Sequence, residues 1–204
     1  MSSLRVGRVA VRVVIAAVIA AVVALPGGPG GVFQGRSASA AAARFTCGSW
    51  QSARKHVLAG EAIEAKLKGP ADRTKATDQY RAALAACQDY PWAYSDLQQS
   101  YGDQRRYSES ARFGWQSIET ARRTKDRWAW SADEYRAFMA GCFDNLGWIE
   151  QVQAAGAGAQ SKGYKTRLTT ALGYYQKALF YSAHDEYARK HVTAIQAYLR
   201  VSKS

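Results

Sequence analysis

A stripe of small and large residues at helical spacing occurs three times in this chain and constrains its fold more than any other feature. Its four positions lie at offsets of 0, +4, +7 and +8, on one face of an α-helix. In the first and third copies, small residues let a second helix approach and larger ones fill the space left. Such a helix pair leaves apolar surface uncovered, so copies are expected to stack. The three sets are Ala76, Tyr80, Ala83 and Leu84; Ser110, Gly114, Ser117 and Ile118, 34 residues later; and Ala171, Tyr175, Ala178 and Leu179.

The residues between the first two copies resemble the tetratricopeptide repeat (TPR) family. Tyr94, Leu97 and Tyr101 follow the order found in the first helix of such a repeat. The segment Arg105–Glu109 resembles the turn into the second helix, and Pro91 lies where the family has a proline between repeats. The resemblance implies an all-α fold of antiparallel helical hairpins, stacked as a short solenoid of about three repeats.

Two positions depart from the family pattern. Gln98 replaces the usual glycine, and Gly114 stands where an aromatic residue is common. The resemblance covers about residues 57–182, and its motifs indicate a binding protein and not an enzyme.

The first 40 residues have the order of a secretory signal. Arg5, Arg8 and Arg12 precede thirteen uninterrupted apolar residues, 13–25, and Ala38–Ala40 offers a small-residue cleavage site. A membrane-spanning helix needs about 20 apolar residues, so cleavage is preferred, with retention as a membrane anchor as the alternative. A secreted or extracytoplasmic location, with the cell envelope included, is predicted.

The remaining residues, 41–204, fit one domain. Repeats are expected at about 57–90, 91–124 and 132–182, followed by a capping helix at about 185–201. A spacing of 34 aligns Ile63 with Leu97, and a spacing of 41 aligns Phe138 with Leu97. About seven extra residues therefore lie around 124–130, and about twenty lie within 143–163. The longer insertion is either a partner-contact element or a tolerated surface insertion.

The three cysteines suggest one disulfide. Cys47 precedes the first expected helix and Cys87 ends the second, and antiparallel packing brings these two ends together. A Cys47–Cys87 bond is therefore predicted for an exported chain. Cys142 occupies an apolar helix position and is expected to be buried, with an intermolecular bridge as the alternative.

No arrangement of residues predicts catalysis, a cofactor or a metal. His56, His184 and His191 lack acidic or cysteine ligands at the usual spacings. Ser52 and Lys55 have the spacing of a serine activated by lysine but lack the companion motifs. Nucleic acid is not an expected partner, because the chain is predicted to be exported and carries no known nucleic-acid motif.

In the TPR family, the first helices of the repeats line a concave groove, and the resemblance implies a protein or peptide partner there. Some members hold a peptide carboxylate with Lys and Asn, but Glu61, Gln99 and Arg136 stand at those positions, so such a clamp is not predicted. Trp92 is the best single anchor, because tryptophan contributes strongly to interfaces; packing against the preceding hairpin is the alternative. The predicted partner-binding residues are Glu61, Trp92, Gln99, Asp103, Arg136 and Asp144.

A second hypothesis is binding of carbohydrate or of an anionic envelope polymer. Residues 41–204 carry 24 Lys and Arg against 16 Asp and Glu, a formal charge of +8, together with many Trp and Tyr. Trp128 and Trp130, in the shorter insertion, separate the two hypotheses. Exposed together, they would favour sugar stacking; buried, they would belong to the core. The oligomeric state is not predicted.

Overall fold

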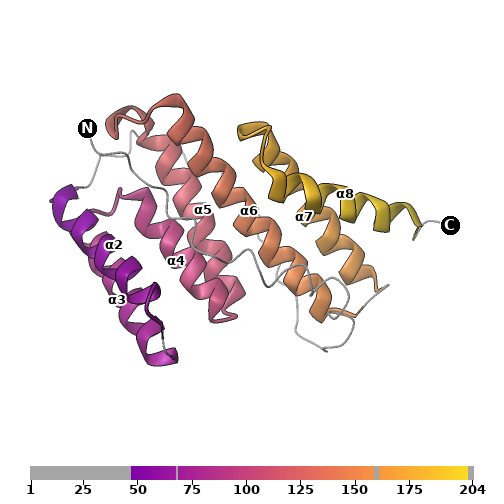
Figure 1. Cartoon of the computed structure of the whole chain (residues 1–204), viewed down its shortest axis with the longest axis horizontal. Coiled ribbons are helices and arrows are strands. Elements are labelled where there is room, and N and C mark those ends of the chain that lie inside the picture. Colours follow the sequence, from indigo (N-terminus) through magenta and orange to yellow (C-terminus); the bar gives the residue numbers. More distant parts are fainter. Residues whose placement is uncertain (1–46, 68, 159–160, 202–204) are drawn as a thin grey trace, which may run out of the picture.

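The computed structural model describes residues 47–67, 69–158 and 161–201, which form helices packed in antiparallel pairs (Figure 1). The expected all-α fold of antiparallel helical hairpins is therefore confirmed. The expected signal segment, residues 1–40, lies outside the described residues. Within the described part, no helix is long and apolar enough to span a membrane. The helices are α2 (Trp50–Glu64), α3 (Pro70–Ala86), α4 (Pro91–Asp103), α5 (Tyr107–Arg123), the 3-10 turn η2 (Lys125–Arg127), α6 (Ala132–Gly156), α7 (Lys162–Tyr181) and α8 (Glu186–Val201).

The hairpins stack in chain order. α2 packs on α3, α4 on α5 and α6 on α7, and each hairpin contacts the next through α3–α4 and α5–α6. The first helices also contact one another, α2 with α4 and α4 with α6. They therefore share one side of the solenoid, and α8 packs against α7 at the far end (Figure 1).

Local sequence sets where the helices begin. Pro70 and Pro91 occupy the first positions of α3 and α4, where a missing backbone donor costs nothing. Ser131 and Glu134 form a capping box at α6: the Ser131 hydroxyl accepts from Glu134 N at 3.1 Å, and the Glu134 carboxylate accepts from Ser131 N at 2.9 Å. Pro91 and the Ser131 capping box therefore begin the first helices α4 and α6, whereas Pro70 begins the second helix α3.

Each hairpin is closed by one large buried side chain lying over a glycine. In the first, the Tyr80 ring of α3 covers Gly60 of α2, and in the third the Tyr175 ring of α7 covers Gly147 of α6. A Cβ added at Gly60 would lie 2.4 Å from Tyr80 Cε1, and one at Gly147 would lie 2.9 Å from Tyr175 Cε1. Both tyrosines are fully buried, so each ring fills space that only glycine leaves open.

The middle hairpin makes the same contact in reverse. Gln98 of α4 is the large residue, and Gly114 of α5 leaves the space, with a hypothetical Cβ only 2.4 Å from Gln98 Nε2. Gln98 is fully buried and donates from Nε2 to the Cys142 carbonyl oxygen at 3.4 Å. The two departures from the family pattern therefore compensate each other across one helix pair.

This contact also fixes which residues are equivalent between hairpins. Gly60, Gln98 and Gly147 occupy the same position of the first helices, so the spacings there are 38 and 49 residues and not 34 and 41. The expected register is wrong by four residues in α2 and by eight in α6. The reason is connection length: 20, 16 and 28 residues separate the two partners of the contact in the three hairpins.

Candidate functional site

The side formed by α2, α4 and α6 carries most of the candidate residues. Equivalent positions are held by Glu61, Gln99 and Trp148, each one residue after the close-packed position. Glu61 and Gln99 are exposed, whereas Trp148 is half-buried and lies 3.0 Å from a hypothetical Cβ at Gly102 of α4. This side therefore runs from acidic on α2, through polar on α4, to aromatic on α6.

Three carboxyl groups meet where α2 contacts α4. Glu61 and Glu64 come from α2, and Asp96 comes from α4. Burial raises the pKa of Asp96 well above its usual value, and the charges of Glu61 and Glu64 raise it further. Burial also raises the pKa of Glu61 and of Glu64. Asp96 Oδ2 is buried and makes no hydrogen bond in the described part of the chain.

Tyr80 closes the inner side of this acidic junction. Its ring is fully buried over Gly60, and its hydroxyl oxygen makes no hydrogen bond of normal geometry within the described residues. The pKa of Tyr80 is raised, first by burial and then by the charges of Asp96, Glu64 and Glu61. Its polar end is therefore directed at the three carboxyl groups.

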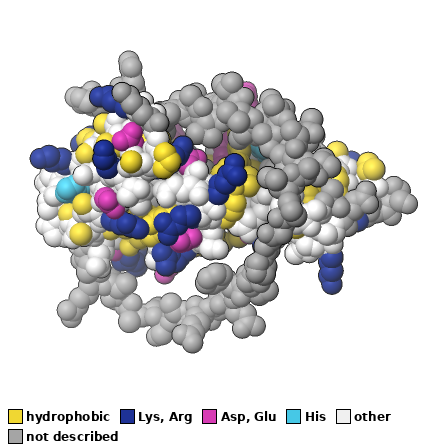
Figure 2. All heavy atoms as spheres, turned by 90° about the horizontal axis from the view of Figure 1, so that it is seen from below, with side chains coloured by type: hydrophobic (Ala, Val, Ile, Leu, Met, Phe, Trp, Pro, Cys, Tyr) yellow, Lys and Arg dark blue, Asp and Glu magenta, His cyan; other side chains and the backbone are white. Residues whose placement is uncertain are grey.

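Two cations lie near the junction. Arg73 of α3 donates from Nη1 to Asp103 Oδ2 at 3.0 Å, which places the predicted site residue Asp103 in an ion pair. Burial raises the pKa of Tyr90 to about 12, although the charge of Arg54, which is exposed on α2, lowers it. In the view of Figure 2, side chains of both charge signs lie interspersed with apolar ones, so the excess positive charge forms no single patch over the described residues of that face.

Trp92 lies in an aromatic cluster instead of standing free on the surface. Its ring stacks on Trp130 with centroids 4.3 Å apart and meets Tyr90 at 5.0 Å and Phe138 at 5.9 Å. Trp92 and Trp130 are half-buried. The ring therefore packs toward the following insertion and α6, and its removal would perturb packing as well as any binding surface.

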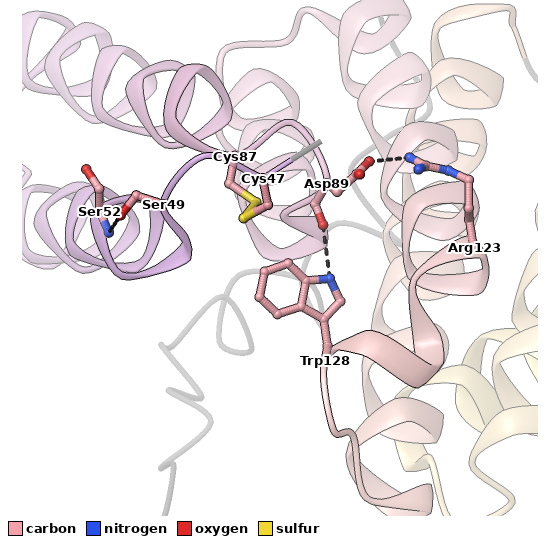
Figure 3. The surroundings of a disulfide bond; sticks show 7 residues. All are labelled: Cys47, Ser49, Ser52, Cys87, Asp89, Arg123 and Trp128. Atoms are coloured by element: carbon pink, nitrogen blue, oxygen red, sulfur yellow. Dashed lines mark hydrogen bonds and ion pairs between the residues drawn. A yellow bond between two sulfur atoms is a disulfide. The ribbon is translucent and has the colours of Figure 1, made fainter. Parts of the chain in front are cut away.

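Trp128 anchors the shorter insertion to the end of the first hairpin (Figure 3). Its Nε1 donates to the Asp89 carbonyl oxygen at 3.0 Å, and the Asp89 carboxylate accepts from Arg123 Nη2 at 2.5 Å. Trp128 is half-buried, and Asp89 is almost fully buried. Both tryptophans of the insertion are half-buried and take part in packing, so they are neither exposed together nor fully in the core.

The remaining predicted site residues lie apart from the junction. Arg136 is exposed near the start of α6 and pairs with Asp133 of the same helix at 2.5 Å. Asp144 is half-buried farther along α6, where its charge contributes to the raised pKa of Tyr175 and Tyr187, whose first cause is burial. The structure therefore places Glu61, Gln99 and Asp103 on neighbouring first helices, but not Arg136 beside them.

Glu64 and Asp96 are members of the junction that the sequence did not single out. A partial signal existed, because Glu61 and Glu64 lie three residues apart and therefore share a helix face. Asp96 could be added only once the register between α2 and α4 was known.

The cysteines occupy two different environments. Cys47 and Cys87 lie at disulfide distance, with Cα atoms 4.0 Å apart, and join the segment before α2 to the end of α3 (Figure 3). The backbone N–H groups of Gly48 and Ser49 both donate to the Ala86 carbonyl oxygen at 3.1 Å, which supports the same junction. Cys142 is buried, and burial raises its pKa to about 11, so the thiol is held protonated.

The histidines do not form a metal site. His56 Nδ1 lies 2.8 Å from Gln79 Oε1, and His191 is buried between the rings of Tyr175 and Tyr187 at 4.8 Å and 4.4 Å. Across the residues that the structure places, no group of His, Cys, Asp and Glu could hold a metal ion.

Comparison with known proteins supports the fold. No family model matches the sequence, and no curated protein matches it. Among solved structures, the chain is similar to "First TPR of Spaghetti (RPAP3) bound to HSP90 peptide SRMEEVD". The identity is 12%, the TM-score is 0.56, and the match covers 74% of this chain and 96% of the other. At this identity the likeness concerns the fold alone: the chain has a TPR-like architecture.

Proposed function

We propose that this protein is a scaffold that binds a peptide segment of a partner protein along the side formed by α2, α4 and α6. The observation that carries the proposal is the direct contact of α2 with α4 and of α4 with α6, which aligns exposed polar side chains of successive hairpins. The TPR domain with the similar fold was solved with a peptide bound. Repeat solenoids commonly use such a continuous surface for binding.

The proposed ligand differs from the one in that structure. A peptide ending in Glu-Glu-Val-Asp is acidic, and Glu61 and Asp96 would repel it. The partner-binding residues proposed here are therefore Glu61, Gln99 and Asp103, with Trp148 as an aromatic contact. Trp92 is a weaker candidate, because it already packs against Trp130.

A random-peptide phage library selected on the full chain tests this function. The enriched peptides should bind the wild-type protein, and Gln99→Trp, which blocks the proposed surface, should weaken them by about tenfold or more, as loss of a central contact commonly does. The matched control is Gln116→Trp, at an exposed position of the second helix α5, which should leave binding unchanged. Failure to enrich any peptide, or equal effects of the two variants, would refute the proposal.

We also propose that the protein acts outside the cytoplasm. The order of charged, apolar and small residues in 1–40 supports export, and a Cys47–Cys87 bond needs an oxidising compartment to persist. Fractionation of the source cells, with mass spectrometry of the N-terminus and of the thiols, tests this. A reduced protein that keeps residues 1–40 in the cytoplasmic fraction would contradict it.

A further inference from the structure

We propose that the acidic junction of α2 and α4 is a subsite for a cationic side chain, so that this surface selects peptide segments carrying arginine or lysine. The inference rests on the proposed peptide-binding function and adds the chemistry of the ligand. The junction consists of Glu61, Glu64, Asp96 and the hydroxyl of Tyr80.

Acidic groups outnumber the available cations at the junction. Besides burial, the charges of Glu61 and Glu64 raise the pKa of Asp96, and the charge of Asp103 raises the pKa of Glu64. The cation that acts on Glu64, Arg73, is already engaged with Asp103 at 3.0 Å. Carboxylates brought together without a cation are unfavourable, and an incoming guanidinium or ammonium would relieve that repulsion. Glu61 is exposed, so the junction can be reached from solvent.

Two buried oxygen atoms at the junction also lack well-formed hydrogen bonds. Both Tyr80 Oη and Asp96 Oδ2 are buried and make no hydrogen bond of normal geometry in the described part of the chain, although buried polar atoms normally make one. Burial raises the pKa of Glu64, and the Tyr80 hydroxyl lies close enough to that carboxyl group to lower its pKa, so the hydroxyl faces the junction. Tyr80 is fully buried, with its ring fixed over Gly60, so its hydroxyl oxygen is held in place and not displaced by chance. Arginine and lysine carry only donors, which suits carboxylate and phenolic oxygen acceptors.

The charge of the junction is opposite in sign to the net charge of the domain. Residues 41–204 have a formal charge of +8, yet this junction is locally acidic. A generally basic surface repels basic peptides at long range. A local acidic site would therefore bind a basic side chain only where its carboxyl groups lie, and not through the net charge of the protein. Clustered carboxyl groups with unmade hydrogen bonds also cost stability in the free protein, which is typical of sites kept for a ligand.

The decisive experiment compares peptide selections on two proteins. The random-peptide library is selected on the full wild-type chain and on the variant Glu61→Gln/Asp96→Asn. Arginine or lysine should be enriched at one fixed position of the wild-type pool and should fall to the level of the unselected library on the variant. Enriched peptides that bind this surface but show no excess of arginine or lysine would overturn the inference and leave the proposed function standing. An empty selection would remove both.

A double-substitution cycle then tests direct pairing. An enriched peptide and its Arg→Gln version are titrated against the wild type, Asp96→Asn and the control Glu119→Gln, which removes an exposed carboxylate from α5. Loss of the arginine should weaken binding about tenfold in the wild type and in the control, the size expected for a charge-assisted contact. In the Asp96→Asn protein, the same Arg→Gln change in the peptide should weaken binding by no more than about threefold. Equal loss in all three proteins would refute pairing with Asp96.

A melting curve separates a binding role from a structural one. Asp96→Asn should melt at the same temperature as the wild type or higher, because the carboxyl gains no hydrogen bond through Oδ2 and is repelled by Glu61 and Glu64. A lower melting temperature together with lost binding would mean that Asp96 maintains the fold, and the inference would fail.

Discussion

The reversed contact of the middle hairpin gives a sharp test of how this solenoid is built. Gly114→Tyr alone would place a ring where a Cβ is already 2.4 Å from Gln98 Nε2 and 2.6 Å from Gln98 Cδ. Overpacking of this kind costs about 1–3 kcal/mol or more. Gln98→Gly alone removes a fully buried side chain, which costs about 2–4 kcal/mol through lost contacts and lower helix propensity.

The double variant Gln98→Gly/Gly114→Tyr should recover most of this loss. It recreates the arrangement of Tyr80 over Gly60 and of Tyr175 over Gly147, in which the ring from the second helix fills the space beside a first-helix glycine. We therefore expect a favourable coupling free energy of at least about 2 kcal/mol between the two positions, near the upper end for contacting residues.

Urea unfolding followed by circular dichroism measures the free energy of unfolding of the four proteins. The control is Gly141→Ala in α6, where a Cβ would meet nothing within 4 Å; it should stabilise the protein by up to about 1 kcal/mol. The opposite result would be a loss in the double variant that equals the sum of the losses in the two single variants to within about 0.5 kcal/mol. In that case the side chains at positions 98 and 114 do not fill the same space, and the register inferred from this contact is wrong.

Three further predictions concern stability. Cys47→Ser/Cys87→Ser should lower the free energy of unfolding by about 3–4 kcal/mol, as expected for a loop of 40 residues, with reduction of the wild type giving the same loss. The wild type should lose stability as pH falls from 6.5 toward about 4, because burial lowers the pKa of His191 to about 4 and only the unfolded chain takes up the proton in this range. His191→Phe should make the free energy of unfolding less dependent on pH over this range. The same pH profile in the variant and the wild type would contradict the assignment. Arg123→Gln should cost about 2–3 kcal/mol because Asp89 is only 2% exposed, whereas Arg136→Gln, whose partner is 91% exposed, should cost at most about 1 kcal/mol; equal losses would mean that the burial of Asp89 is irrelevant.

Periodicity predicted the fold because it is a local property. The offsets that join Tyr80 to Ala76 and Ala83 lie within one helix, and the structure buries all three. The pairing of Tyr80 with Gly60 is not local, since it depends on the length of the connection between α2 and α3. A glycine within a helix does not indicate which ring packs over it. The register between the first helices could therefore not be predicted from the sequence.

The candidate site depended on that register and was therefore only partly predictable. Glu61 and Gln99 lie on exposed faces of first helices, as the sequence predicted, because either spacing leaves them there. Asp96 was missed, since its importance comes from two carboxyl groups on another helix. Trp92 was expected either to anchor a partner or to pack against the preceding hairpin. Its stacking partner, Trp130, lies in an insertion whose path no periodic pattern describes.

The two ends of the solenoid are protected unequally, with a consequence for the order in which the molecule opens. A terminal hairpin has a neighbour on one side only, so a linear array loses its end units before its centre. At the first hairpin, the Cys47–Cys87 link holds the start of α2 beside the end of α3 and opposes their separation. At the other end, α8 is held to α7 by noncovalent packing among side chains such as Tyr175, Tyr187 and His191. Under oxidising conditions, amide protons of α8 should therefore exchange with solvent well before those of α2, and reduction should bring the two rates closer together.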